Sequence, residues 1–289
     1  MTTDLVPQPR RAGRHARYDL PLQIVVPIGA GSEVTRQIAG RSVIEMVVAN
    51  LTPAGAHRFV FVLDPALPDV HDLFGRLGIL FPQAQVLIAT DAAADAAADA
   101  AGAGVAGAVP LVLAAEQLLD EDAPLLVAEP DVWLDLDVDS YLAAHTASGD
   151  DGYLTVVITD TQIPGLGLQT AGAPSGPASA GAKCYVDIDD TGRPVAVVAD
   201  PVSEVAAAGI CTFTRAGYFL NAAHAMLAMD VRLHGEFQVA GAMAELVAAG
   251  GRFGMYALGR EDAGLHRLAT AADAERFITL PVAREAVIG

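Results

Sequence analysis

A glycine turn follows the first apolar run of this 289-residue chain, and it has the form of a loop that holds phosphate groups. Leu22–Ile28 is an almost unbroken apolar run, which is typical of a buried parallel strand. Because glycine has no Cβ, backbone N–H groups in such a turn can approach an anion closely, and a following helix adds its positive end. Residues 42–51 have the spacing of that helix. The predicted phosphate-binding residues are Gly29, Ala30, Gly31 and Ser32. An ordinary strand-to-helix turn is the alternative interpretation.

The positive charge that phosphate chemistry needs is scarce in this chain. Lys183 is the single lysine, and it lies far along the sequence from the glycine turn. Glu33 follows the turn directly, and a carboxylate there opposes an approaching anion. Arg36 and Arg41 are the nearby cations, and a guanidinium can hold a phosphate through two hydrogen bonds. We therefore expect these two arginines to be the catalytic cations of the loop, if it has any.

Several segments occur in an order that is typical of one enzyme family. Residues 42–51 read SVIEMVVANL, 128–135 read AEPDVWLD, 183–198 read KCYVDIDDTGRPVAVV, and 233–240 read LHGEFQVA. Over residues 22–278 this order resembles the sugar-nucleotidyltransferase family, whose members join a sugar phosphate to a nucleoside triphosphate. The resemblance implies an α/β fold with a mostly parallel, twisted sheet flanked by helices, and a mixed extension of that sheet around residues 186–214.

The resemblance also implies roles for particular residues. Asp131 matches the family's metal-binding aspartate, and a carboxylate just beyond the strand predicted at 124–128 suits Mg²⁺ shared with substrate phosphates. Lys183, Gly209 and Glu236 fall in segments that contact the substrate in the family. The alternatives are a solvated turn aspartate for Asp131 and a structural role at a helix start for Glu236.

The departures from the family pattern concern charge. The family has arginine where this chain has Glu33, and the Pro-Lys-Pro segment that follows it in the family is missing here. The family's sugar-side Glu-Lys pair falls on Ala199 and Asp200. We therefore predict a degenerate member that binds a sugar phosphate or nucleotide sugar weakly and acts with a partner protein of the same pathway. The alternative is an active Mg²⁺-dependent nucleotidyltransferase in which Arg36 or Arg41 replaces the family lysine.

Composition excludes several other classes of protein. The formal net charge of −18 argues against nucleic acid and anionic membrane surfaces as partners. Cys184 and Cys211 lack metal-type spacing, so we expect reduced core residues in a cytoplasmic protein. A dinucleotide-binding fold would need a third glycine after Gly31, and a hydrolase triad would need a nucleophile-elbow motif; the sequence has neither.

Composition also divides the chain along its length. Residues 1–19 carry four arginines without an apolar stretch, so we predict a disordered basic tail, and we expect residues 20–289 to form a single domain. Residues 90–108 are alanine-rich, and 101–107 match the place of the family's base-binding loop. Residues 161–182 are rich in Gly, Pro, Ser and Ala, which predicts a flexible insertion.

Overall fold

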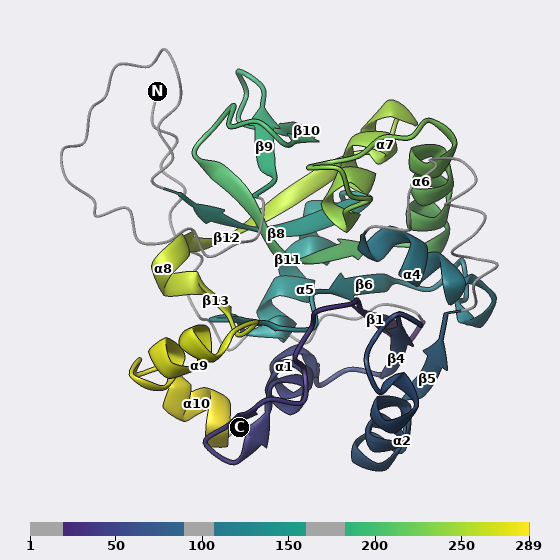
Figure 1. The fold of residues 1–289 in the computed structure, drawn as a ribbon. Helices are drawn as coiled ribbons and strands as arrows, with labels where there is room; N and C mark the ends of the chain where they lie inside the picture. The colour runs from purple at the N-terminus through teal and green to yellow at the C-terminus, as the bar shows by residue number, and fades with distance from the viewer. Residues whose placement is uncertain (1–19, 90–106, 160–182, 289) are drawn as a thin grey trace.

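The computed structural model describes residues 20–89, 107–159 and 183–288, and one nine-stranded sheet forms its centre (Figure 1). The strand order is β10-β9-β11-β6-β1-β4-β5, and β8 and β12 continue the sheet from β11. The predicted tail at 1–19, the candidate base loop at 101–106 and the predicted insertion at 161–182 lie outside the described residues.

The parallel part of the sheet is most buried at its centre, where two adjacent strands have only buried residues. It consists of β1 (Leu22–Ile28), β4 (His57–Leu63), β5 (Gln85–Ile88) and β6 (Leu125–Ala128). Ile24 and Val26 of β1 belong to one core cluster, whereas Val25 belongs to the other. This arrangement explains why the sequence of β1 is apolar without alternation.

Helices cover the two faces of the sheet as two separate layers (Figure 1). One layer contributes to the first core cluster and contains α1 (Val43–Leu51), α2 (Val70–Leu80), α5 (Val138–Ser148), α9 (Ala271–Ile278) and α10 (Ala283–Ile288). The other contains α4 (Ala108–Ala114), α6 (Ala216–Ala228) and α7 (Ala242–Ala248). Short 3₁₀ turns span Glu116–Leu118 and Val239–Gly241. Within the described ranges, no helix has the length and apolar character needed to cross a membrane.

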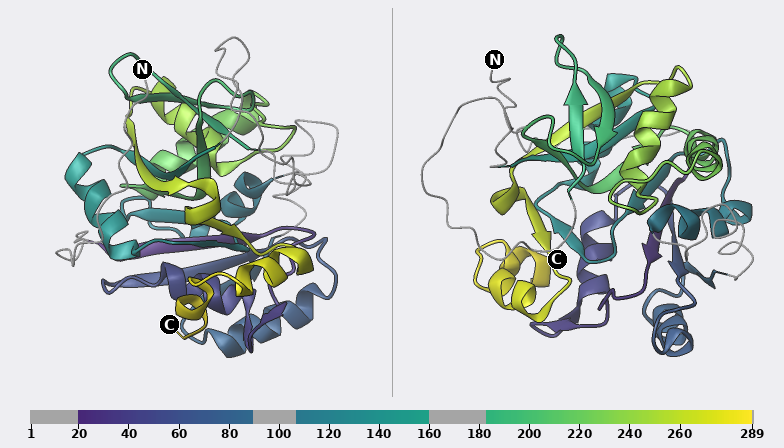
Figure 2. Two further views of the ribbon diagram at one scale, coloured as in Figure 1. Left: turned by 90° about the vertical axis from the view of Figure 1, so that its left-hand side faces the viewer. Right: turned by 45° about the horizontal axis from the view of Figure 1, so that its top comes forward.

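The other half of the sheet is mostly antiparallel, which confirms the predicted mixed extension (Figure 2). It is formed by β8 (Gly152–Ile158), β9 (Tyr185–Ile188), β10 (Pro194–Val198), β11 (Val205–Phe213) and β12 (Phe253–Arg260). The strand β11 runs antiparallel to β6, β8 and β9, and β12 is parallel to β8.

A C-terminal segment returns to the parallel half of the molecule. After α8 (Glu261–Gly264), β13 (Leu265–Arg267) pairs antiparallel with β7 (Val132–Leu134). His266 is buried against Trp133 and Phe277, with ring centroids 5.7 and 5.3 Å away. Two further strands, β2 (Gln37–Ile38) and β3 (Arg41–Ser42), form a small hairpin before α1. Figure 1 shows α9 and α10 beside α1.

A polar network lies within the core beneath β8 and β11. The hydroxyl of Tyr141 donates to the Tyr153 carbonyl at 2.9 Å and lies 2.8 Å from Thr212 Oγ1. His145 stacks on the Tyr153 ring at 5.1 Å, and its Nε2 is 3.1 Å from the Asp150 carbonyl oxygen. Burial lowers the pKa of His145 to about 4.

We predict that His145 makes the fold sensitive to acid. The unfolded chain takes up a proton at this side chain near pH 6.5, whereas the folded chain does so only near pH 4. Stability should therefore fall as the pH drops from 6.5 to about 4, by up to about 3 kcal/mol. His145→Gln should be less stable at pH 7 but should lose this part of the pH dependence in urea titrations. Thr146→Ala, which removes no titrating group, should keep the wild-type slope.

Candidate functional site

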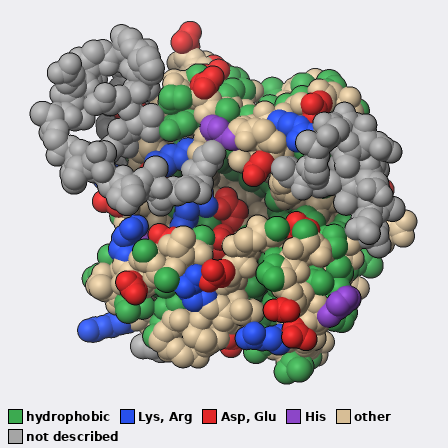
Figure 3. Space-filling model, viewed as in Figure 1, with side chains coloured by type: hydrophobic (Ala, Val, Ile, Leu, Met, Phe, Trp, Pro, Cys, Tyr) green, Lys and Arg blue, Asp and Glu red, His purple; other side chains and the backbone are tan. Residues whose placement is uncertain are grey.

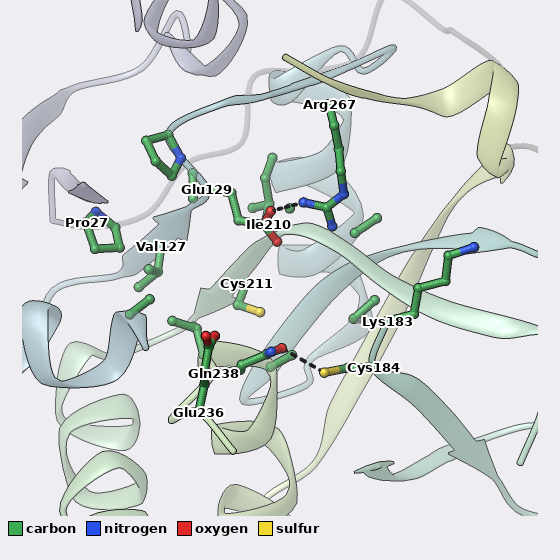
Figure 4. A pocket seen from close by; sticks show the side chains of 18 of the residues that line it. Pro27, Val127, Glu129, Lys183, Cys184, Ile210, Cys211, Glu236, Gln238 and Arg267 are labelled. Carbon is green, nitrogen blue, oxygen red and sulfur yellow. Dashed lines mark hydrogen bonds and ion pairs between the residues drawn. The ribbon is translucent and has the colours of Figure 1, made fainter. Parts of the chain in front are cut away.

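A cavity of about 350 Å³ opens where β6 ends and β9 begins (Figure 4). Both strands pair with the same edge of β11, and β8 occupies the other edge. Between them, Glu129 N–H donates to the Gly209 carbonyl at 2.9 Å, and Ala207 N–H donates to the Cys184 carbonyl at 2.8 Å. The β11 residues in this interval therefore form the floor of the cavity, and Pro27 at the end of β1 lies at its wall.

Gly209 gives β11 the irregular backbone that this floor requires. Its φ is +69°, and the pairing of β11 with β8 shifts register between Ala207 and Cys211. A side chain is strained at such a φ. A Cβ on Gly209 would also lie 3.0 Å from Val132 Cγ1. The glycine identified from the resemblance is thus a residue of the cavity.

An ion pair between Glu129 and Arg267 crosses the cavity wall (Figure 4). Arg267 Nη1 donates to Glu129 Oε2 at 2.8 Å, and the exposed fractions of the two side chains are 28% and 43%. Glu129 follows β6 directly, whereas Arg267 is the last residue of β13. The Glu129 carboxylate raises the pKa of the Arg267 guanidinium. Acidic and basic side chains also interleave over this face of the molecule in Figure 3.

Lys183 lies at the cavity and is also paired. Its Nζ donates to Glu261 Oε2 at 2.6 Å, and both side chains are about one-third exposed. His234 Nε2 is 2.7 Å from the Lys183 carbonyl oxygen. These contacts join the chain just before β9, the first residue of α8 and the turn that carries Glu236.

Glu236 lies in a tight turn rather than at a helix start. Leu233 and Glu236 exchange backbone hydrogen bonds of 2.9 and 3.0 Å, and His234 and Gly235 both have positive φ. Glu236 lines the cavity, and Gln238 follows it on the same wall (Figure 4).

The two cysteines also line this cavity. Cys184 Sγ donates to Gln238 Oε1 at 2.8 Å, and burial, followed by the charge of Glu129, raises the pKa of the Cys184 thiol to about 12. Burial likewise raises the pKa of the Cys211 thiol. Both are free thiols, and both stay protonated at neutral pH.

The glycine turn is separate from this cavity, and one of its backbone N–H groups is bound to a carboxylate of the chain itself. Ala30 N–H donates to Asp64 Oδ2 at 3.3 Å, and Ser32 N–H donates to the Gly29 carbonyl at 3.2 Å. Gly31 has a φ of +92°, as a turn of this kind needs. Asp64 follows β4 directly, so its position comes from the pairing of β4 with β1.

Comparison with solved structures identifies the architecture. A nucleoside-diphosphate-sugar pyrophosphorylase from Vibrio cholerae is 16% identical, with a TM-score of 0.57 over 89% of this chain and 100% of that one. An inositol-1-phosphate CTP transferase from T. maritima is 14% identical, with a TM-score of 0.58 over 88% and 91%. A putative glucose-1-phosphate thymidylyltransferase from Bacillus anthracis is 10% identical, with a TM-score of 0.57 over 88% and 93%.

This chain has the fold of the sugar nucleotidyltransferases. The resemblance seen in the sequence is therefore confirmed for the fold. No protein-family model and no curated protein sequence matches the chain.

Some of the predicted residues of this nucleotidyltransferase fold line one of two separate hollows. Lys183, Gly209 and Glu236 line the cavity, whereas Ser32, Glu33 and Arg36 line a separate hollow against α2. Arg36 makes an ion pair with Glu33, which turns its charge toward a neighbouring acid.

Arg41 lies away from both hollows. Its Nη1 donates to the Ala286 carbonyl at 3.2 Å and to the Val287 carbonyl at 3.4 Å, in α10. This contact attaches the C-terminal helix to the hairpin before α1. A catalytic role for Arg41 stays a prediction, and it would require these hydrogen bonds to break.

Asp131 lies between β6 and β7, and it does not line the cavity. Burial raises its pKa to about 6, with Glu129 as the next cause. The neighbouring positive group is Arg267, and among the described residues no three acidic, histidine or cysteine side chains are grouped to hold a metal ion. The arrangement does not fit a preformed Mg²⁺ site, so the metal role of Asp131 stays a prediction.

Sequence reasoning missed Glu129, Arg267 and Gln238. Glu129 could have been found from the rule that ligands bind beyond the carboxyl ends of parallel strands. Arg267 had no local signal, because β13 is only three residues long and its position depends on pairing with β7.

We predict that Asp131 destabilises the fold at neutral pH. Because its pKa is raised in the folded chain, the contribution of Asp131 to stability is largest below pH 3.8 and is lost as the pH rises through about 6. At pH 7.5 the free energy of unfolding of Asp131→Asn, measured by urea titration, should therefore exceed that of wild type by about 1–3 kcal/mol. Near pH 4 the two proteins should be equally stable. Asp190→Asn, on an exposed turn, should show no such difference.

The same variant addresses the metal. If Asp131 binds Mg²⁺, the ion should stabilise wild type at pH 7.5 and leave Asp131→Asn unchanged. Equal stabilisation of both proteins by Mg²⁺ would contradict the metal role.

Proposed function

We propose that this protein binds a sugar phosphate or a nucleotide sugar in the cavity beside β11, and that it is a degenerate nucleotidyltransferase with weak affinity for nucleoside triphosphates. On this proposal it acts with a partner protein of the same pathway. The proposal rests on a contrast between the two halves of the site. The cavity is large enough for a small ligand and has polar side chains at its walls. At the phosphate loop, by contrast, Asp64 and Glu33 already pair with the N–H and guanidinium groups that a phosphate would need.

The hydrogen bond from Ala30 N–H to Asp64 carries the proposal. A phosphate-binding turn works by offering backbone N–H groups to an anion, and here an acidic side chain takes one of them. Glu33 takes the nearest guanidinium, that of Arg36, in the same way. A triphosphate would have to displace two carboxylates and would remain close to both, which costs Coulomb energy.

The sugar side of the fold supports binding. Its cavity of about 350 Å³ falls within the size range of small-ligand pockets. Apolar β11 residues form the floor, and the walls carry the polar side chains of Glu129, Lys183, His234, Glu236, Gln238 and Arg267. Few polar groups around an apolar floor are the usual means of fixing the orientation of a small ligand.

The active-enzyme alternative requires the arginines near the loop to change their partners. Arg36 would have to exchange Glu33 for a phosphate, or Arg41 would have to leave the carbonyl groups of α10. Neutralising the pyrophosphate leaving group is the main demand of nucleotidyl transfer, and loss of preorganised charge raises that barrier. The two proposed functions therefore differ in whether an arginine at the loop is released to bind the triphosphate.

A partner and a location form part of the proposal. Phe74, Ile79 and Leu80 of α2 are exposed large apolar side chains, which are common where proteins meet. The free thiols of Cys184 and Cys211 suit the reducing cytoplasm.

We predict that removing the two acids will restore triphosphate binding. Calorimetry with Mg²⁺ and a nucleoside triphosphate should show weak binding to wild type, and the double variant Glu33→Arg, Asp64→Asn should bind about tenfold tighter or more. Glu275→Arg repeats the glutamate-to-arginine substitution at an exposed position of α9, far along the chain from the loop, and should leave the affinity unchanged. Tight triphosphate binding by wild type, or pyrophosphate release with a sugar phosphate, would show that the active alternative is correct.

A further inference from the structure

Arg267 reaches the cavity because of its register in a short ribbon. In the antiparallel pair of β7 and β13, Arg267 is opposite Val132 and His266 is opposite Trp133. Side chains alternate along a strand, so His266 enters the aromatic core and Arg267 points to the other side. There its guanidinium is directed toward Glu129 at the cavity wall (Figure 4).

The guanidinium has donors to spare. Of its five N–H donors, one on Nη1 donates to Glu129, and the described residues provide no other hydrogen-bond partner. The side chain is 28% exposed, and the cavity lies beside it. Asp131 and Glu261 are close enough to add to the negative charge around it. The neighbouring carboxylates therefore stabilise the charged guanidinium of Arg267, and several of its N–H groups remain available to a ligand.

Among the described residues, Lys183 is the other lysine or arginine that lines the cavity, and its compact ammonium lacks the planar fork that holds a phosphate at two points. Lys183 is paired with Glu261. Asp200, which aligns with the lysine of the family's sugar-side pair, is exposed just beyond β10 and does not line the cavity. The positive charge expected from the segment after β10 is thus absent from the cavity wall, and a guanidinium from the C-terminal ribbon is present there.

We propose that Arg267 is the anion-binding residue of the cavity, and that its ligand is the phosphate group of a small sugar phosphate. The Glu129 carboxylate holds the guanidinium when no ligand is bound, and the phosphate takes its place through a two-point contact. Glu129, which is 43% exposed, then turns toward water. This inference rests on the proposed function, because it specifies the residue and the chemical group by which the cavity would bind its ligand.

The exchange of Glu129 for phosphate makes opposite predictions for the two members of the ion pair. Arg267→Gln removes the charge that the phosphate needs, so the affinity for α-D-glucose 1-phosphate should fall about tenfold or more. Glu129→Gln removes the competing carboxylate, so the affinity should rise. A purely structural ion pair would give losses in both variants. Arg267→Lys keeps the charge without the planar fork and should give an intermediate affinity.

The experiment measures binding of glucose 1-phosphate, glucose, inorganic phosphate and UDP-glucose by calorimetry. Thermal unfolding of each unliganded variant checks that it is folded. Arg215→Gln, which breaks an exposed ion pair with Asp122, serves as the matched control and should bind as wild type does. Glucose alone should bind far more weakly than glucose 1-phosphate if the phosphate is the group that Arg267 recognises.

The outcomes separate the inference from the function on which it rests. Wild type that binds a sugar phosphate or UDP-glucose, with equal affinity in Arg267→Gln, would overturn the role of Arg267 and leave the proposed function intact. Wild type that binds none of the four compounds would overturn both. A weaker affinity in Glu129→Gln would show that the exchange does not occur, because Glu129 would then support binding, either by holding Arg267 in place or by contacting the ligand.

Discussion

The pairing of β11 with two different strands along one edge is the constraint on which the site depends. β6 and β9 are both antiparallel to β11, and each occupies only part of that edge. β8 runs along the opposite edge and keeps β11 continuous. The interval between β6 and β9 is therefore open without breaking the sheet. Groups that flank it, Glu129 on one side and Cys184 on the other, become cavity walls by position alone.

Most of the described lysine and arginine side chains are paired with an acidic side chain. The chain has 17 arginine and lysine residues against 35 acids, so most cations have an acid within reach. Glu33, Glu129 and Glu261 each pair with a cation that lies at one of the two hollows. An anionic ligand must compete with these carboxylates, and the cost of that competition differs with exposure, because water screens the more exposed pairs.

The sequence was most informative where structure is local. The limits of β1 follow from its apolar run, and α1 begins where Ser42 and Glu45 form a capping box. The cavity residues Lys183, Gly209 and Glu236 came from a resemblance to known proteins, and they do lie together. Arg267 and the binding partner of Arg41 could not be predicted, because each depends on contacts with residues more than 100 positions away. Propensity and periodicity carry no information about such pairs.

Gly209 connects the floor of the cavity with the ribbon that carries Arg267. A methyl group at Gly209 would crowd Val132 at 3.0 Å and would contact Leu134 at 3.6 Å, both in β7. β7 has β13 as its hydrogen-bonded neighbour, and Arg267 is paired directly with Val132. Added volume at Gly209 would therefore act on Val132, which is the strand partner of Arg267. A side chain at Gly209 would therefore strain the backbone at its φ of +69° and also crowd Val132, the residue opposite Arg267 in the ribbon.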